Sequence, residues 1–305
     1  MDVDALLPRD VAQRAEAVGV AKVRLPALHA AVLAVLAGAF ISLGAVFSTV
    51  VTAGGGTPPG VARLLGGLVF SLGLVLVVVA GAELFTGNVL VVMAAASRRV
   101  RVRALLRSWL IVYAGNFAGA LVTTAALVRS GIYERGDGAI GVRALDIAAT
   151  KTSLAWDEAI LLGVFANALV CLAVWLSLSA RSVTDKVLAV VFPVSAFVAA
   201  GFEHSIANMY FVPAGLFLRA WAPDGFWAAA GVGPGAYGSV TWQDFLVGNL
   251  LPVTIGNIIG GALLVGLVYW FVYLRGGAGP DHAEATGDGH RGPSALSRPR
   301  VRHPS

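Results

Sequence analysis

Long apolar runs dominate this chain and alternate with short polar connections. The first, from His29 to Val51, contains no Asp, Glu, Lys or Arg. A membrane-spanning helix needs about 20 apolar residues, and six runs reach that length. They cover residues 28–52, 62–96, 104–128, 157–180, 187–219 and 245–274. The pattern predicts an all-α membrane protein with six transmembrane helices.

Two of these runs are too long for one straight span and contain polar residues near their centres. The second run is interrupted by GAELFTGN at 81–88, and the fifth by GFEHSIAN at 201–208. Backbone groups freed by a break in the bilayer are costly unless they are satisfied, so irregular backbone occurs where it lines a cavity. We therefore expect the second and fifth helices to be broken close to a transport site.

The two interruptions match each other in sequence. Both read Gly-x-Glu-x-x-x-small-Asn, and Glu83 and Glu203 are separated by the same 120 residues (203 − 83 = 208 − 88 = 120) as Asn88 and Asn208. The segments GNFAG and GNIIG recur in the helices that follow, and AVF and AVW in those that precede. Because each half holds three spans, an odd number, the halves must run in opposite directions. The sequence predicts a 3+3 inverted repeat.

The repeated residues are expected to hold the broken helices together. Glycine permits the required backbone angles, and the Glu and Asn side chains can bond the freed backbone groups. These structural residues are Gly81, Glu83, Asn88, Gly201 and Asn208. Glu203 is expected to orient its neighbour as well.

His204 departs from the repeat, because the corresponding position in the first half is Leu84. A lone buried histidine is usually a satisfied core residue. An ionisable group inside a membrane segment is, however, a functional hypothesis by default. We expect His204 to contact the substrate.

The two ends of the chain differ from the apolar centre. Residues 2–25 place apolar residues at helical spacing among charges, which indicates an amphipathic helix at the membrane surface, with a disordered leader as the alternative. The tail is rich in Gly, Pro and charge and is expected to be disordered. The predicted organisation is a cytoplasmic amphipathic segment (1–26), a six-helix transmembrane channel or transporter domain (27–275) and a disordered cytoplasmic tail (276–305).

Composition and charge support this class. The chain is 57% hydrophobic and 13% charged, whereas a soluble domain carries about 25% charged residues. The net charge of +5 comes from basic residues in connections and tails, which indicates topology signals rather than nucleic-acid binding. The single cysteine, Cys171, excludes a disulfide within the chain.

Basic residues divide the connections into two classes. The second-to-third connection carries four arginines, and the fourth-to-fifth carries Arg181 and Lys186. The connection 52–61 has no charge, and 129–156 is mixed in sign. Basic connections are retained in the cytoplasm, so we expect a multi-pass protein of the inner or plasma membrane with both termini in the cytoplasm.

Four segments, GAELFTGN, GFEHSIANM, NLLPVTIGNIIGG and ANALVCLAVWLS, resemble the signature segments of the formate–nitrite transporter family. The resemblance covers about residues 25–275, and GFEHSIANM followed by VPAG is closer to the formate-type branch. It implies an aquaporin-like fold, a homopentamer with one pore per protomer, and transport of formate or a similar small anion. It implies no enzyme activity, cofactor or metal.

The resemblance also assigns roles by position. The residues that meet the substrate and exchange its proton would be His204, Asn257 and Thr86. The residues that attract the anion and line the outer vestibule would be Lys151, Asn167 and Glu203. The apolar constrictions would be formed by Phe70, Leu74, Leu84 and Phe197.

These residues permit proton-coupled transport. A bare anion in an apolar constriction faces a desolvation cost of order tens of kcal/mol, whereas protonating a carboxylate of pKa ~3.9 at pH 7 costs roughly 4 kcal/mol. We expect Lys151 to attract the anion and His204 to donate or relay a proton, while Asn257 and Thr86 orient it. The alternative keeps the substrate ionic and opens a channel through a flexible loop around Thr86.

Three of these assignments have structural alternatives. Lys151 is otherwise a solvated loop lysine, Asn257 a helix-to-helix bond, and Thr86 a helix cap. Nitrite, hydrosulfide and short-chain carboxylates are alternative substrates within the same family.

Other functional classes fit less well. A neutral-solute channel of the aquaporin type, the distant alternative, would carry two Asn-Pro-Ala motifs, and the chain has none. An ammonium channel would pair histidines along its pore, but the other four histidines lie outside the broken spans. A membrane enzyme would need a nucleophile with its base or clustered metal ligands.

Overall fold

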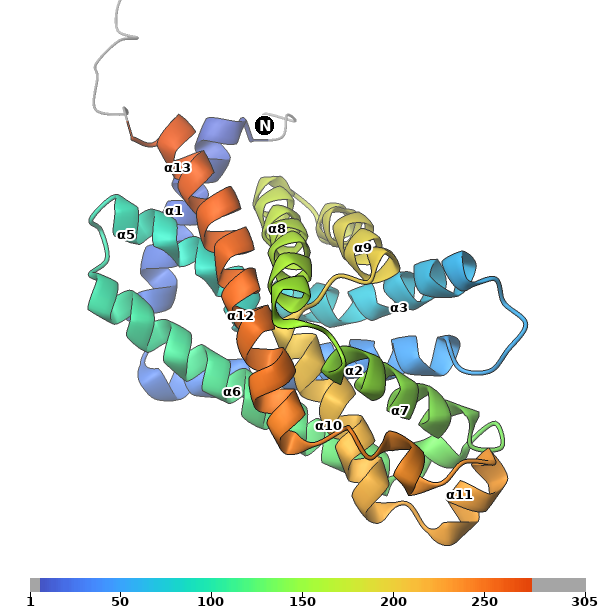
Figure 1. Cartoon of the computed structure of the whole chain (residues 1–305). Coiled ribbons are helices and arrows are strands. Elements are labelled where there is room, and N and C mark those ends of the chain that lie inside the picture. Colours follow the sequence, from blue (N-terminus) through green and yellow to red (C-terminus); the bar gives the residue numbers. More distant parts are fainter. Residues whose placement is uncertain (1–5, 276–305) are drawn as a thin grey trace, which may run out of the picture. The chain divides into compact units, whose positions relative to one another are not determined.

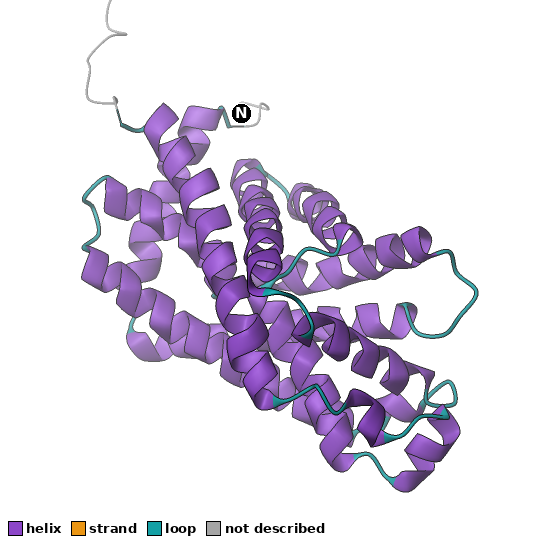
Figure 2. Ribbon diagram, viewed as in Figure 1, coloured by secondary structure: helices purple, strands orange, loops and turns teal. Residues whose placement is uncertain are grey.

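The computed structural model describes residues 6–275, and every regular element among them is a helix (Figure 2). Six helical stretches are long and apolar enough to cross a membrane. They are α2 (Ala27–Val51), α3 (Pro59–Ala80), α6 (Val102–Arg129), α8 (Trp156–Ser179), α9 (Val183–Ala200) and the stretch Asp244–Tyr273. The predicted all-helical class with six membrane helices is confirmed.

The last span is continuous but changes pitch along its length. It consists of η4 (Asp244–Leu250), α12 (Leu251–Ile258), η5 (Ile259–Leu267) and α13 (Val268–Tyr273), of which η4 and η5 are π-helical. The shorter helices are α1 (Pro8–Arg24), α4 (Phe85–Asn88), η1 (Val89–Val91), α5 (Val92–Ala96), η2 (Ile132–Glu134), α7 (Ala139–Thr152), α10 (Ser205–Trp221), α11 (Asp224–Ala230) and η3 (Pro234–Tyr237).

Two glycines end the helices that precede the matching motifs. The residues after α3 and α9 are Gly81, with φ of 82°, and Gly201, with φ of 77°. Glycine adopts this left-handed backbone at little cost and commonly terminates helices in this way. Three non-helical residues follow each glycine before α4 and α10 begin. The chain over 187–219 is therefore two helices, α9 and α10.

Glycines also bring helices together backbone to backbone. A Cβ added to Gly119 of α6 would overlap the carbonyl oxygen of Val35 on α2, and one added to Gly260 would overlap that of Val164 on α8. Small residues permit such approach between membrane helices. In this way α6 is held against α2 and the last span against α8 (Figure 1).

The N-terminal helix α1 packs on the protein. Its apolar side, which includes Val11, Ala15 and Val20, is buried and contacts η1, α5 and α13 (Figure 1). The sequence suggested that this apolar side lies on the membrane surface, but the structure uses it for contact with the other helices. The predicted tail, 276–305, lies outside the described residues.

Candidate functional site

The non-helical segment after α3 is held by side chains from two other elements. Asn88 donates to Oε2 of Glu83 at 2.6 Å. The amide of Asn116 on α6 accepts from the backbone N–H of Phe85 at 2.9 Å and donates to the carbonyl oxygens of Ala34 and Glu83 at 2.8 and 2.9 Å. These bonds satisfy backbone groups that the interruption frees from helical pairing.

The segment after α9 has the same set of contacts. Asn208 donates to Oε2 of Glu203 at 2.6 Å. Asn257, on α12, accepts from the N–H of Ser205 at 2.9 Å and donates to the carbonyl oxygens of Gly163 and Glu203 at 2.8 and 2.9 Å. The contacts of the two segments therefore correspond one to one, which accounts for the paired Glu and Asn residues in the sequence.

This geometry leaves the side chain of Asn257 no free donor for a substrate. Both its amide hydrogens and its oxygen are bonded to backbone groups, and the residue is fully buried. The structure therefore favours the helix-to-helix role, the alternative reading of Asn257, over orientation of a substrate.

Each glutamate also forms an ion pair with a lysine. Nζ of Lys22 on α1 lies 2.7 Å from Oε1 of Glu83, and Nζ of Lys151 on α7 lies 2.8 Å from Oε1 of Glu203. Asn249 lies beside the second pair, where it accepts from Asn208 at 2.7 Å and donates to the backbone of Lys151 at 2.8 Å. The charge of Lys151 is therefore compensated by an adjacent carboxylate.

His204 lies where the two segments meet. Its Nδ1 accepts from the backbone N–H of Ala207 at 3.1 Å, and its Nε2 lies 2.9 Å from Oγ1 of Thr86. Because Nδ1 is an acceptor, the neutral ring carries its proton on Nε2, and that nitrogen donates to the threonine. The ring is 3% exposed and stacks on Phe197, with 5.8 Å between ring centroids.

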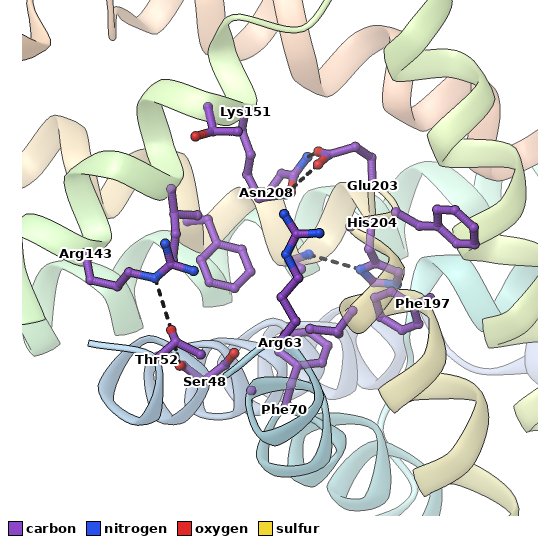
Figure 3. Close-up of a pocket in the computed structure, with 18 residues that line it drawn as sticks. Ser48, Thr52, Arg63, Phe70, Arg143, Lys151, Phe197, Glu203, His204 and Asn208 are labelled. Atoms are coloured by element: carbon purple, nitrogen blue, oxygen red, sulfur yellow. Dashed lines mark hydrogen bonds and ion pairs between the residues drawn. The ribbon is translucent and has the colours of Figure 1, made fainter. Parts of the chain in front are cut away.

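A cavity of about 260 Å³ leads to this histidine (Figure 3). Phe70 and Phe197 pack edge to face beside it, with ring centroids 5.9 Å apart. The other two expected constriction residues, Leu74 and Leu84, are buried at 3% and 2% exposure but do not line this cavity. Asn167 is also outside it and donates to the carbonyl oxygen of Asn257 at 2.7 Å.

Three cations and one carboxylate line the cavity: Arg63, Arg143, Lys151 and Glu203. Arg143 donates from Nε to Oγ1 of Thr52 at 3.1 Å. Burial lowers the pKa of the Arg143 guanidinium, Asp146 opposes that shift and Arg63 adds to it, but a guanidinium stays charged at neutral pH. The charge of these side chains, with His204 neutral, is 3 − 1 = +2.

Comparison with known proteins identifies the chain's relatives. The family model described as Formate/nitrite transporter matches residues 9–271. The chain belongs to the formate/nitrite transporter family. The "Formate channel FocA" of Escherichia coli (strain K12) is 49% identical over 273 residues, covering 89% of this chain and 96% of that protein. The "Probable formate transporter" of Methanothermobacter thermautotrophicus is 38% identical, covering 88% and 97%.

Solved structures of the formate/nitrite transporter family have the same fold. The structure titled "Pentameric formate channel with formate bound" matches with a TM-score of 0.78 and 44% identity, covering 82% of this chain and 98% of that one. One titled "FNT family ion channel" matches with a TM-score of 0.74 and 26% identity, covering 86% and 98%. The resemblance read from the signature segments is thereby confirmed.

The sequence pointed to only part of the cavity wall. The structure brings together His204, Thr86, Lys151, Glu203 and the two phenylalanines, which were all anticipated. To the cavity wall it adds Arg63 and Arg143. Next to the interrupted segments it adds Lys22, Asn116 and Asn249. Asn116 had a detectable signal, since GNFAG matches the GNIIG that contains Asn257. Asn249 is the first residue of the segment NLLPVTIGNIIGG, whereas Lys22 had no such signal.

No metal centre is evident in the described part of the chain. Within residues 6–275 there is no group of three or more His, Cys, Asp or Glu side chains with suitable spacing. The site consists of hydrogen-bond donors, fixed positive charge and aromatic rings.

Proposed function

We propose that this protein is a transmembrane channel or transporter for formate that moves the anion together with a proton. The observation that carries the proposal is the contact of 2.9 Å between His204 and Thr86, next to a positively charged cavity. Its relatives' names support formate as the substrate: FocA is described as a formate channel, and a structural relative has formate bound.

The aromatic boundary of the cavity favours passage of the neutral acid. Phe70 and Phe197 offer no hydrogen bond to an anion, whose transfer into apolar surroundings costs of order tens of kcal/mol. Protonation of an acid of pKa ~3.9 at neutral pH costs only roughly 4 kcal/mol. Formate would therefore cross the aromatic and aliphatic constriction as formic acid, with Leu74 and Leu84 as its further apolar wall.

His204 and Thr86 are the groups proposed to meet the substrate. The Nε2–H of His204, which lines the cavity, and the hydroxyl of Thr86 next to it are both donors that can bond a carboxylate oxygen. The neutral ring cannot supply this proton alone, because loss of the Nε2 proton would leave an imidazolate. A proton must therefore reach Nδ1 through water as the Nε2 proton passes to formate. Protonation of Nδ1 replaces the bond from the Ala207 N–H, so we propose that proton exchange is coupled to a local change at the start of α10.

The ion pair of Lys151 and Glu203 is proposed to shape the field of the outer vestibule. A cation in a low-dielectric mouth raises the local concentration of anions, and Glu203 fixes the position of the ammonium group. Because the carboxylate of Glu203 compensates the charge of Lys151, we propose two roles for this lysine. It attracts anions, and it holds the segment after α9 in position.

We further propose a homopentamer with one pore per protomer, an inverted repeat of three spans in each half, and both termini in the cytoplasm. The structural relative titled a pentameric channel supports the assembly, and the matching contacts of Glu83 and Glu203 support the repeat. Large apolar side chains on the outer helix faces, such as Leu110 and Phe192, suit contact with lipid or a neighbouring subunit. The mass of the detergent-solubilised particle tests the assembly.

The function is tested by reconstitution in liposomes. Uptake of formate, nitrite, hydrosulfide, acetate and lactate is compared at pH 5.5 and 7.5 (roughly 1.6 and 3.6 units above a carboxylic pKa of ~3.9), with water and ammonia permeation as references. We expect formate uptake to exceed that of the other anions and to increase at the lower pH. Faster passage of nitrite would assign the nitrite branch, and passage of water or ammonia alone would exclude an anion pathway.

The role of His204 is tested by His204→Phe, with the same substitution at the exposed His29 as the matched control. We expect His204→Phe to abolish the increase of formate uptake at low pH, while His29→Phe behaves as the unaltered protein. Undiminished proton-coupled uptake in His204→Phe would rule out the histidine as the group that exchanges the proton.

A further inference from the structure

The three cations of the cavity differ in whether a carboxylate compensates their charge. Lys151 is paired with Glu203 at 2.8 Å, and its side chain is only 14% exposed. In residues 6–275, neither Arg63 nor Arg143 takes part in an ion pair. The excess positive charge of the cavity is therefore carried by the two arginines, and the lysine contributes little to it.

Both guanidinium groups are placed to reach an anion in the cavity. Figure 3 shows Arg63 extending from the first turns of α3 and Arg143 from α7 into the space in front of Lys151. Arg143 uses Nε for its bond to Thr52, which orients the group. Among residues 6–275 its terminal nitrogens have no hydrogen-bond partner. Arg63 comes from the opposite wall of the same cavity.

Guanidinium chemistry suits the proposed substrates. A guanidinium offers parallel N–H donors that match the two oxygens of a carboxylate or of nitrite, whereas an ammonium acts as a point charge. A guanidinium keeps its proton at every pH at which the protein functions. Its capture of the ionised substrate is thus independent of the proton exchange at His204.

We infer that Arg63 and Arg143 together form an anion-capture site for a small monovalent carboxylate or nitrite ahead of the aromatic constriction. The inference rests on the proposed function for its substrate, and it deepens that function by separating two steps. The arginines concentrate the ionised form in the cavity, and proton exchange follows at His204. The Lys151–Glu203 pair then serves mainly to hold the segment after α9.

The variants Arg63→Gln and Arg143→Gln, singly and together, test the inference. Arg135→Gln is the matched control, since Arg135 is an exposed arginine between α6 and α7, outside the cavity. Each cavity variant should raise the half-saturating formate concentration roughly threefold to tenfold. This is the effect expected when a cavity that concentrates anions loses one positive charge. Maximal flux should change less than about twofold, because the path beyond the cavity is unaltered.

The dependence of formate uptake on ionic strength provides a second measurement. A purely structural role of the arginines would not change this dependence. Salt screens exposed charges over about 8–10 Å near physiological strength, so formate uptake by the unaltered protein should weaken as sulfate-free inert salt is added. The double variant should lose most of this dependence, and Arg63→Lys with Arg143→Lys should restore it. Cavity variants that match Arg135→Gln in both measurements would overturn the inference.

Binding is measured separately from transport, by saturation-transfer NMR of the formate proton on the detergent-solubilised protein. The signal should be present in the unaltered protein and in Arg135→Gln and lost in the double variant. If this binding pattern is found without any formate flux, the capture site stands and the proposed function fails. If flux is found but binding and half-saturation do not depend on the arginines, the proposed function stands and the capture site fails.

Discussion

Thr86 and His204 lie 118 positions apart in the sequence and meet at 2.9 Å. Each occupies a position whose counterpart in the other half is apolar. The residue 120 positions before His204 is Leu84, and the residue 120 positions after Thr86 is Ile206, which is fully buried. The polar contact between the halves thus arises where their sequences differ, while the groups that support the backbone are the same in both.

We predict that Thr86→Val slows formate uptake without unfolding the protein. Valine keeps the shape of threonine but removes the oxygen that accepts from His204, leaving a buried N–H without a partner at a cost of about 1–3 kcal/mol. If the loss falls on transport, uptake should drop roughly tenfold or more. Initial rates in liposomes at equal protein content provide the measurement.

Thr86→Ser is the control for this prediction, because it retains the hydroxyl and removes only a methyl group. It should keep most of the transport rate. Equal rates for the valine and serine variants would show that the hydroxyl is not used, and would leave Thr86 as a packing residue of α4.

At the scale of elements, the same motif explains where helices end and how the ends are supported. The glycines and the Glu–Asn pairs could be predicted from sequence because they repeat at a fixed spacing. The role of Asn257 could not, because its three partners lie 52, 54 and 94 positions away. Only the folded structure, with α12 packed against α8, shows that the Asn257 amide has all its hydrogen-bonding groups paired with backbone.

Asn257→Leu should destabilise the fold more than it alters substrate preference. Leucine has a similar size but leaves the Ser205 N–H and the Glu203 carbonyl oxygen without these partners. It also removes the additional bond to the Gly163 carbonyl in α8, so three bonds at about 1 kcal/mol each amount to ~3 kcal/mol. Thermal unfolding in detergent should show a much lower midpoint than for Asn167→Leu, which removes one bond. A stable Asn257→Leu protein with altered anion selectivity would instead place Asn257 on the substrate path.

Alanine substitutions at two glycines distinguish the cost of backbone strain from the cost of disturbing a contact between helices. In Gly201→Ala the new Cβ meets no atom within 4 Å, so only the left-handed backbone opposes it, at roughly 1–2 kcal/mol. In Gly260→Ala the Cβ overlaps the carbonyl oxygen of Val164, and the last span must move away from α8. We predict a modest loss of thermal stability for Gly201→Ala and failure to purify as a folded particle for Gly260→Ala.

The opposite order of the two variants would contradict this account. It would mean that the contact between the last span and α8 relaxes easily, and that the backbone at Gly201 is the stricter requirement. Gly225→Ala serves as a reference, since its added Cβ also meets nothing within 4 Å and Gly225 does not have positive φ.

For the molecule as a whole, hydropathy was sufficient to predict six spans, since each predicted run overlaps an apolar helix of at least 18 residues. It was insufficient for α1, whose apolar side looks the same whether it faces a membrane or other helices. The partners of α1 include η1, α5, α8 and α13, and the ion pair of Lys22 with Glu83 spans 61 positions. Such contacts depend on tertiary packing and leave no periodic trace in the sequence.

The proposed orientation in the membrane can be tested with introduced thiols, because the native Cys171 is fully buried. Ser130→Cys and Thr184→Cys place exposed thiols in the α6–α7 connection and at the start of α9. Basic connections are retained in the cytoplasm, and the α8–α9 connection carries Arg181 and Lys186.

In right-side-out membrane vesicles, an impermeant maleimide should therefore label Ser130→Cys and leave Thr184→Cys unlabelled. Inverted vesicles should give the reverse pattern, and the unaltered protein should stay unlabelled in both, which controls for access to Cys171. Labelling of Thr184→Cys in right-side-out vesicles would place both termini outside the cell. The cavity with its two arginines, which α7 borders, would then open to the cytoplasm and capture anions there.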